Sequence, residues 1–552
     1  MNYKRVNNRR TFLLELGGAA LALTTRWQAT RSADSAQFIN ATTTLGMLRG
    51  MRDANGARFL GIRYAQAPRG ALRWLPPLPA STWTDTRDAL SFAPMAPQLL
   101  RGAPAPDAPI GPAASGKPDL ERLQRGPIDE DCLALNVWTP LPLASAAQRP
   151  VMVWFHGGGY QSGSGAAQSF DGSELARQHQ VVVVTVNYRL NVFGFLHLGE
   201  LFGADYASSG NAGLQDCVAA LQWVQRNIAA FGGDPHCVTI WGQSAGAGIV
   251  SCLLAMPAAR GLFHRAIAES GSALRLRSVA EATQAARTLL SAAGVSSLAE
   301  LQSLPTASWL QAYTGTRIPS APLLDGTLLP RHPFDPDAPT LSADIPLLTG
   351  SNSHEATFFV GTPVANAPLD AIDESTLHAL VMKTMALDAA DAQSLIAAFR
   401  AVHTRLDPVH LYQRIASDWL WTDPILLQAQ RKAALGAASV YVYSFEQPCS
   451  AVEGRLGATH TLEIPYVFGT LDAIPDLKPV TGAMRRLAWS MGAAWSEFAR
   501  HGAPTAASLP KWSAYDADSR RILRLTEQPA LLHNPNPAIR DIVARLKGRA
   551  PT

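Results

Sequence analysis

Short apolar runs separated by glycine, proline and asparagine dominate residues 45–195. Four of these runs, at 60–64, 134–138, 151–155 and 181–186, have the length of a β-strand. The later runs are almost continuously apolar and do not alternate with polar residues, so we expect strands that are buried on both faces. A mostly parallel sheet covered by helices satisfies this pattern.

Helical periodicity follows the strand-like region. Apolar residues recur at helical spacing across 216–231, and two glycines end that segment. Residues 278–315 and 367–438 are rich in alanine and leucine, so we expect helical insertions over the sheet. Residues 98–128, rich in proline, glycine and alanine, indicate a surface loop. The sequence has no internal repeat and no change in its hydrophobic pattern that would divide the chain into domains. We therefore expect one large α/β domain over 34–552.

The first 33 residues differ in composition from the rest. The pair Arg9 and Arg10, an apolar Phe-Leu step and a Gly/Ala-rich stretch resemble a twin-arginine export signal. We therefore expect residues 1–33 to be removed and the mature protein to be periplasmic or secreted. The alternative is an amphipathic N-terminal helix on a cytoplasmic protein. No other window is apolar for long enough to span a bilayer, so we expect no membrane span in the mature protein.

Charge and cysteine content exclude two classes of partner. The formal charge of the whole chain is +4, and residues 1–33 alone carry +5, which leaves −1 for the remainder. A basic surface for nucleic acid is therefore not expected. The five cysteines form no CxxC pair and lack the spacing of zinc ligands. Their odd number leaves at least one thiol unpaired.

A serine motif provides the first candidate chemistry. Gly-Gln-Ser-Ala-Gly at 242–246 follows the apolar run 238–241 and precedes small residues at 247–250. In the G-x-S-x-G pattern a strand turns sharply into a helix and exposes the serine hydroxyl to a base. The motif alone is equally consistent with a structural strand-turn-helix junction, so its context must decide whether Ser244 is a nucleophile.

The sequence His-Gly-Gly-Gly-Tyr at 156–160 lies directly after the strand-like run 151–155. Consecutive glycines let backbone N–H groups approach a ligand without obstruction from side chains. A flexible glycine turn is the other interpretation. Together with the serine motif downstream, the segment predicts an oxyanion hole formed by the N–H groups of Gly158, Gly159 and Ala245.

Further segments carry a family resemblance through nearly the whole mature chain. In order they are GIRYA at 61–65, EDCLALNVW at 130–138, NYRL at 187–190, GNAGL at 210–214, FGGDP at 231–235, ESGS at 269–272 and WSEFA at 495–499. With the two glycine motifs, this series resembles the type-B carboxylesterase/lipase family. The resemblance implies an α/β-hydrolase fold, a large mostly parallel sheet flanked by helices, and hydrolysis of a small-molecule carboxylic ester without a metal or organic cofactor.

The same resemblance implies two partners for Ser244. The segment 348–359 is similar to the one that carries the family's catalytic acid, which places the acid at Glu355. The segment 457–469 is similar to the histidine segment, which places the base at His460. The order Ser, Glu, His is that of α/β-hydrolases. We expect acyl transfer through a serine ester, with the histidine as base and the glutamate holding its tautomer.

Four other residues have two interpretations each. Ser270 and Glu463 match family positions that support the histidine, and ordinary polar packing is the alternative for both. Phe358 and Phe359 follow the proposed acid and either line the pocket or belong to the core.

Departures from the family pattern narrow these expectations. The family usually pairs the cysteine at 132 with an upstream cysteine, but the matching stretch at 93–98 has none, so we expect Cys132 to be a free, buried thiol. Gln243 stands where many members have glutamate, and Ala356 where many have glycine. The loop 98–128 has no tryptophan to meet a quaternary ammonium, which argues against choline esters.

Competing functions on the same fold differ in what they require. A non-catalytic binding protein would typically lose the serine, which this chain keeps. A lipase needs a large apolar lid, and the loop 98–128 is too polar for one. An amidase or carbamate hydrolase would use the same site. Small to medium carboxylic esters are the expected substrates, and no sequence pattern indicates an oligomeric state.

Overall fold

The computed structural model describes residues 37–99, 127–143, 148–359, 372–450 and 454–549. The expected export signal at 1–33 and residues 100–126 of the expected surface loop lie outside the described residues. Ala36–Thr552 forms one compact unit.

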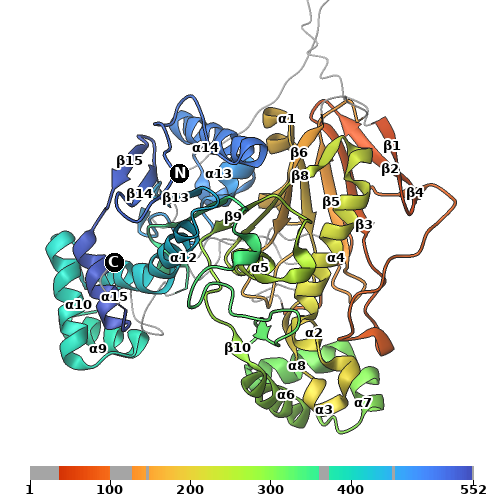
Figure 1. The fold of residues 1–552 in the computed structure, drawn as a ribbon, viewed down its shortest axis with the longest axis horizontal. Helices are drawn as coiled ribbons and strands as arrows, with labels where there is room; N and C mark the ends of the chain where they lie inside the picture. The colour runs from red at the N-terminus through yellow and green to blue at the C-terminus, as the bar shows by residue number, and fades with distance from the viewer. Residues whose placement is uncertain (1–36, 100–126, 144–147, 360–371, 451–453, 550–552) are drawn as a thin grey trace, which may run out of the picture. The chain divides into compact units, whose positions relative to one another are not determined.

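A large mixed sheet forms the centre of this unit (Figure 1). In order across the sheet, its strands are β1 (Gln37–Thr43), β2 (Gly46–Asp53), β3 (Gly56–Arg63), β5 (Ala134–Thr139), β7 (Val182–Val186), β6 (Arg149–Phe155), β8 (Gly233–Gln243), β9 (Arg265–Glu269), β12 (Leu347–Asn352), β13 (Val440–Phe445), β14 (Arg521–Leu525) and β15 (Ala530–His533). The short β4 (Arg87–Asp88) pairs with β2.

The sheet has a parallel and an antiparallel part. Neighbouring strands from β7 to β14 are parallel, whereas β1, β2, β3, β5 and β7 pair antiparallel in that order, as do β14 and β15. The predicted strands at 60–64 and 134–138 thus lie in the antiparallel part. Apolar content does not reveal this difference, because β5 is as completely buried as β6 and β7.

Helices cover both faces of the sheet, as predicted. One face packs against α4 (Ala212–Asn227), α5 (Ala245–Ala255) and α12 (Asp423–Ala434). The other packs against α1 (Ser173–His179), α13 (Ile464–Phe468) and α14 (Gly482–His501). Strand β6 illustrates the reason: Val151, Val153 and Phe155 enter the first core, and Met152 and Trp154 enter the second. A strand buried on both faces needs apolar side chains at every position.

The predicted helical insertions form two groups with cores of their own (Figure 1). The first comprises α6 (Val279–Ala293), α7 (Leu298–Ser303) and α8 (Thr306–Thr316), and packs with α2 (Asn191–Phe195) and α3 (Gly199–Phe202). A two-stranded sheet of β10 (Arg277–Ser278) and β11 (Leu323–Leu324) adjoins α6. The second group comprises α9 (Glu374–Met385), α10 (Ala389–Val402) and α11 (Pro408–Ser417). It is joined by α15 (Pro537–Leu546), which lies outside the predicted insertions.

Side-chain caps explain where several inserted helices begin. Ser278 and Ser297 form capping boxes with glutamates three residues later, at the starts of α6 and α7. Asp373, Asp388 and Asp407 cap α9, α10 and α11. In the part of the chain that is described, no helix combines the length and the hydropathy needed to cross a bilayer.

Candidate active site

Ser244 occupies the sharp turn between β8 and α5. Its backbone has φ = 56° and ψ = −119°, a left-handed conformation that is strained for a residue with a side chain. The Ser244 N–H donates to the Glu269 carbonyl at 2.9 Å, which ties the turn to the next strand. A side chain at Gly246 would collide with the Phe155 carbonyl, and one at Gly242 with the Gly246 backbone. The small residues of the motif are therefore required by the turn.

The glycine segment after β6 lies against this turn. A Cβ atom on Gly157 would stand 3.2 Å from the Ser244 Cβ. Gly158 and Gly159 have φ of 101° and 62°, and a side chain at Gly158 would collide with Ser162. Ala245 is the first residue of α5. The three predicted oxyanion residues thus lie on the two segments that flank Ser244.

His156 anchors the start of the glycine segment. Its ring stacks on the Tyr188 ring at 4.4 Å between centroids, and the Tyr188 hydroxyl donates to the His156 carbonyl at 2.7 Å. The histidine is 1% exposed, and burial lowers the pKa of His156 to about 4. The ring is therefore neutral in the folded protein near neutral pH.

The predicted acid and base meet in the structure, although 105 residues separate them in the chain. His460 Nδ1 contacts Glu355 Oε2, and the two side chains are 2% and 0% exposed. Glu355 begins η9 (Glu355–Phe358), directly after β12, and its other oxygen accepts the Asn352 N–H at 2.7 Å. Beside a carboxylate, Nδ1 carries the proton and Nε2 presents its lone pair.

Ser270 and Glu463 belong to one buried network behind this pair. The Ser270 hydroxyl donates to Glu463 Oε1 at 2.9 Å, and the Asn352 side-chain amide donates to Glu463 Oε2. Burial, followed by the repulsion of Glu355, raises the pKa of Glu463 to about 7. Asn352 links the two carboxylates and was not predicted. Asn352 could have been found from the sequence as an amide side chain at the carboxyl end of an apolar strand.

A third carboxyl group, Glu269, lies behind the network. It is 0% exposed, and Trp495 Nε1 donates to its Oε1 atom. Burial and the repulsion of Glu463 raise the pKa of Glu269 well above its usual range. This cluster therefore favours a proton on its inner members, while Glu355 contacts the imidazole.

Aromatic rings surround the imidazole of His460. The centroids of Phe358, Phe359 and Trp421 lie 5.7, 5.0 and 6.0 Å from that of His460. Phe359 stacks on Trp421 at 5.0 Å with an interplanar angle of 19°. Phe359 is 47% exposed and Phe358 half-buried, so both phenylalanines lie at the site and not in the core. Trp421, which was not predicted, belongs to a π-helical turn, η10 (Asp418–Thr422).

Comparison with known protein families identifies the family of this chain. The model of the carboxylesterase family matches residues 37–540. The chain belongs to the carboxylesterase family. It is a carboxylesterase, a hydrolase that acts on carboxylic ester bonds, as the family resemblance implied.

Relatives match this carboxylesterase over nearly its whole length. It is 32% identical to the para-nitrobenzyl esterase of Bacillus subtilis over 521 residues, which cover 92% of this chain and 99% of the relative. It is 34% identical to liver carboxylesterase 1 of Oryctolagus cuniculus, with 83% and 84% covered. The structure of a thermophilic para-nitrobenzyl esterase superposes with a TM-score of 0.77 at 31% identity, covering 91% of this chain and 99% of the other.

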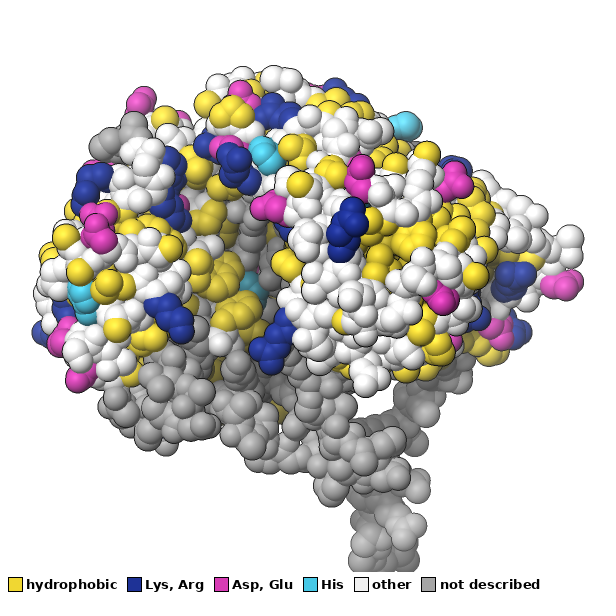
Figure 2. All heavy atoms as spheres, turned by 90° about the horizontal axis from the view of Figure 1, so that it is seen from below, with side chains coloured by type: hydrophobic (Ala, Val, Ile, Leu, Met, Phe, Trp, Pro, Cys, Tyr) yellow, Lys and Arg dark blue, Asp and Glu magenta, His cyan; other side chains and the backbone are white. Residues whose placement is uncertain are grey.

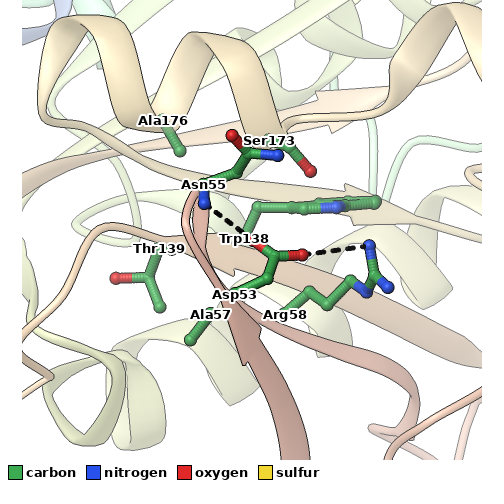
Figure 3. Close-up of a pocket in the computed structure, with 9 residues that line it drawn as sticks. Asp53, Asn55, Ala57, Arg58, Trp138, Thr139, Ser173 and Ala176 are labelled. Atoms are coloured by element: carbon green, nitrogen blue, oxygen red, sulfur yellow. Dashed lines mark hydrogen bonds and ion pairs between the residues drawn. The ribbon is translucent and has the colours of Figure 1, made fainter. Parts of the chain in front are cut away.

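Hydrophobic side chains line a hollow in one face of the carboxylesterase, with a histidine inside it and basic side chains at its edge (Figure 2). Such walls suit a neutral organic substrate. A second hollow lies at the turn between β2 and β3, where Arg58 points toward Asp53 at 3.8 Å (Figure 3). Trp138 lines this second hollow and pairs with Val183, at the amino end of β7. Ser244 follows the carboxyl end of β8, which is parallel to β7 in the sheet, so the second hollow and Ser244 lie at opposite ends of the parallel strands.

Two departures of this carboxylesterase from its family have structural outcomes. Cys132 is a free, buried thiol, as expected. Among the described residues, no hydrogen bond joins the Ser244 hydroxyl to His460, and the Gln243 side-chain nitrogen lies 3.3 Å from His460 Nε2. Bonds between nucleophile and base are often completed only when substrate binds.

The described residues contain no cluster of three or more His, Cys, Asp or Glu side chains suited to a metal ion.

Proposed function

We propose that the carboxylesterase hydrolyses small to medium carboxylic esters through an acyl-enzyme on Ser244, with His460 as base and Glu355 as the third member of the triad. The observation that carries this proposal is the buried contact between His460 Nδ1 and Glu355. It turns the Nε2 lone pair away from the carboxylate, and the contact of Nε2 with Gln243 brings that atom beside the residue that precedes Ser244.

In the first step, His460 Nε2 takes the Ser244 proton while the Ser244 oxygen attacks the ester carbonyl carbon. The N–H groups of Gly158, Gly159 and Ala245 bind the carbonyl oxygen as it gains negative charge. A donor of this kind contributes on the order of 10²- to 10³-fold in rate. The carbon–oxygen bond to the alcohol then breaks, and the imidazolium returns its proton to the leaving oxygen.

In the second step, water replaces the alcohol. His460 removes a proton from the water as its oxygen attacks the acyl carbon, and the proton then passes to the Ser244 oxygen as the ester bond breaks. Glu355 stays in contact with Nδ1 and stabilises the imidazolium. The rings of Phe359 and Trp421 offer an apolar surface to the substrate beside the imidazole.

Substitution of the nucleophile tests this proposal. Ser244→Ala is expected to lower hydrolysis of a p-nitrophenyl ester by about 10⁴-fold or more, because no other group can form the ester intermediate. It should also abolish covalent labelling by an organophosphate, measured by intact-protein mass spectrometry.

Ser251→Ala is the matched control, because Ser251 is a buried serine on α5 whose hydroxyl donates to the Ala247 carbonyl at 2.9 Å. It should keep both labelling and turnover. Labelling that persists in Ser244→Ala would place the nucleophile elsewhere.

We also propose that residues 1–33 direct export through the twin-arginine route and that residues 34–552 are the mature, single-domain enzyme. The pair Arg9 and Arg10 and the apolar stretch that follows support this proposal.

A further inference from the structure

Gln243 lies between the glycine segment and the catalytic histidine. It is the last residue of β8, and its side chain is 1% exposed. Its side-chain nitrogen is 3.3 Å from His460 Nε2. Its side-chain oxygen faces the other way, because a Cβ atom on Gly157 would stand 3.0 Å from it. A buried amide at this position has no freedom to leave the site without repacking.

The direction of this hydrogen bond follows from the contacts of the imidazole. Glu355 contacts His460 Nδ1, so we assign the proton of the neutral ring to Nδ1 and the lone pair to Nε2. The amide N–H of Gln243 therefore donates to the same lone pair that must accept the Ser244 proton. In the resting site, Nε2 of the proposed base is thus met by a donor from the end of β8.

Charge is distributed unequally around this ring. Glu355 from η9 contacts Nδ1, and Glu463, from the same loop as His460, interacts with the ring electrostatically. The rings that pack on the imidazole from η9, from the residue after it and from η10 carry no charge. Among the described residues, Gln243 is the polar side chain that meets Nε2, and it is neutral.

We propose that Gln243 is a positioning residue that stabilises neutral His460, and so lets the enzyme keep its activity to lower pH than a glutamate at this position would allow. The inference rests on the proposed function. Protonation of Nε2 would set two N–H groups against each other, which disfavours the charged ring. A carboxylate would instead attract the imidazolium.

The amide does not prevent turnover. Once substrate brings the Ser244 hydroxyl to His460, that hydroxyl replaces the Gln243 N–H as the hydrogen-bond donor to Nε2. One neutral hydrogen bond is exchanged for another, so little free energy is lost when the base engages the nucleophile.

The pH dependence of kcat/KM tests this role, measured for phenyl acetate in a pH-stat. Gln243→Glu should move the midpoint of the acidic limb upward by about one pH unit or more, the usual effect of an opposite charge within hydrogen-bond distance. Gln243→Met, which removes the donor without adding charge, should move it upward by about half a unit.

Gln428→Glu is the matched control. Gln428 is also fully buried, and its side-chain oxygen lies 3.4 Å from the Ser251 hydroxyl and not beside His460. The same chemical change there should leave the acidic limb in place. Titration with an organophosphate counts the folded, competent sites in each preparation.

An acidic limb that is unmoved in Gln243→Glu, or that moves equally in Gln428→Glu, overturns the inference. If Gln243→Glu does not fold, Gln243→Met decides, and an unmoved limb in that variant has the same meaning. Loss of the proposed function has a different signature, because it would appear as activity and labelling that survive in Ser244→Ala.

Discussion

At Ser244 the proposed chemistry depends on a strained backbone. A non-glycine residue in this conformation costs about 1–3 kcal/mol, and it persists only where its surroundings hold it. The Ser244 N–H bond to Glu269 and the close approach of Gly246 to Phe155 supply that restraint. The turn could be predicted from the sequence because the close approaches at Gly242 and Gly246 leave no room for a side chain two residues before or after the serine.

A second single residue, His156, makes the free energy of unfolding depend on pH. Burial lowers the pKa of His156 to about 4 in the folded protein, below the usual value of 6.5. As the pH falls below 6.5, the unfolded chain therefore binds a proton that the folded protein refuses until about pH 4. We expect His156 to cost about 2 kcal/mol of stability between pH 7 and pH 5.

Urea unfolding of His156→Gln at both pH values measures this contribution, and the variant should lose less stability on acidification than the parent. His236→Gln removes an exposed histidine as the control and should behave like the parent. Equal losses in the parent and in His156→Gln would contradict the assignment.

At the scale of elements, the inserted helices form one wall of the site. Helix α11 runs into the π-helical turn η10 and then into α12. Such turns are frequent at functional sites because they change the direction in which side chains point. Here the turn carries Trp421 onto the face of Phe359. The sequence predicted helices across 367–438, but not the turn, because five residues are too few to show a periodicity of their own.

The stacked rings of Phe359 and Trp421 predict how the rate of hydrolysis depends on the length of the acyl chain. In a series of p-nitrophenyl esters, we expect the parent to be fastest on short and medium chains. Trp421→Ala should lower kcat/KM for the medium chains by about 10-fold and that for acetate less, because longer chains lose more apolar contact.

Trp489→Ala is the control, since Trp489 is an exposed tryptophan on α14 that packs on His179. Its profile should match that of the parent. Peak rates at about ten carbons or more, rising above the micelle threshold, would instead favour a lipase.

At the scale of the molecule, the parallel strands place the site at one edge of the sheet. The glycine segment follows β6, Ser244 follows β8, Glu355 follows β12, and the loop that carries His460 follows β13. Because these strands are parallel, their carboxyl ends meet at the same edge, where ligands bind in open α/β sheets. Residues far apart in the sequence therefore converge without any local signal.

Export is the prediction that concerns the whole chain. Replacing Arg9 and Arg10 with lysine should leave full-length precursor in the cytoplasm, because the twin-arginine pathway selects for the arginine pair. Cell fractionation followed by immunoblotting measures the distribution. A periplasmic yield equal to that of the parent would contradict the proposal, and a Lys4→Arg variant controls for the change of basic side chain outside the pair.

The sequence by itself determined the features that the backbone requires locally. The turn at Ser244, the glycines at 157–159 and the fully apolar strands each need particular residue types at fixed spacing. The proposed acid and base, by contrast, were predicted from family resemblance, since nothing near Glu355 or His460 in the sequence predicts their meeting.

Only the tertiary structure decided which side chains touch across the site. Asn352 joins Glu463 over 111 residues and Gln243 reaches His460 over 217. The antiparallel pairing of β3 with β5 and the stack of Phe359 on Trp421 belong to the same class. Such contacts depend on how whole helices and strands pack against each other. This packing produces no regular spacing of residues in the sequence, so the contacts could not be inferred from it.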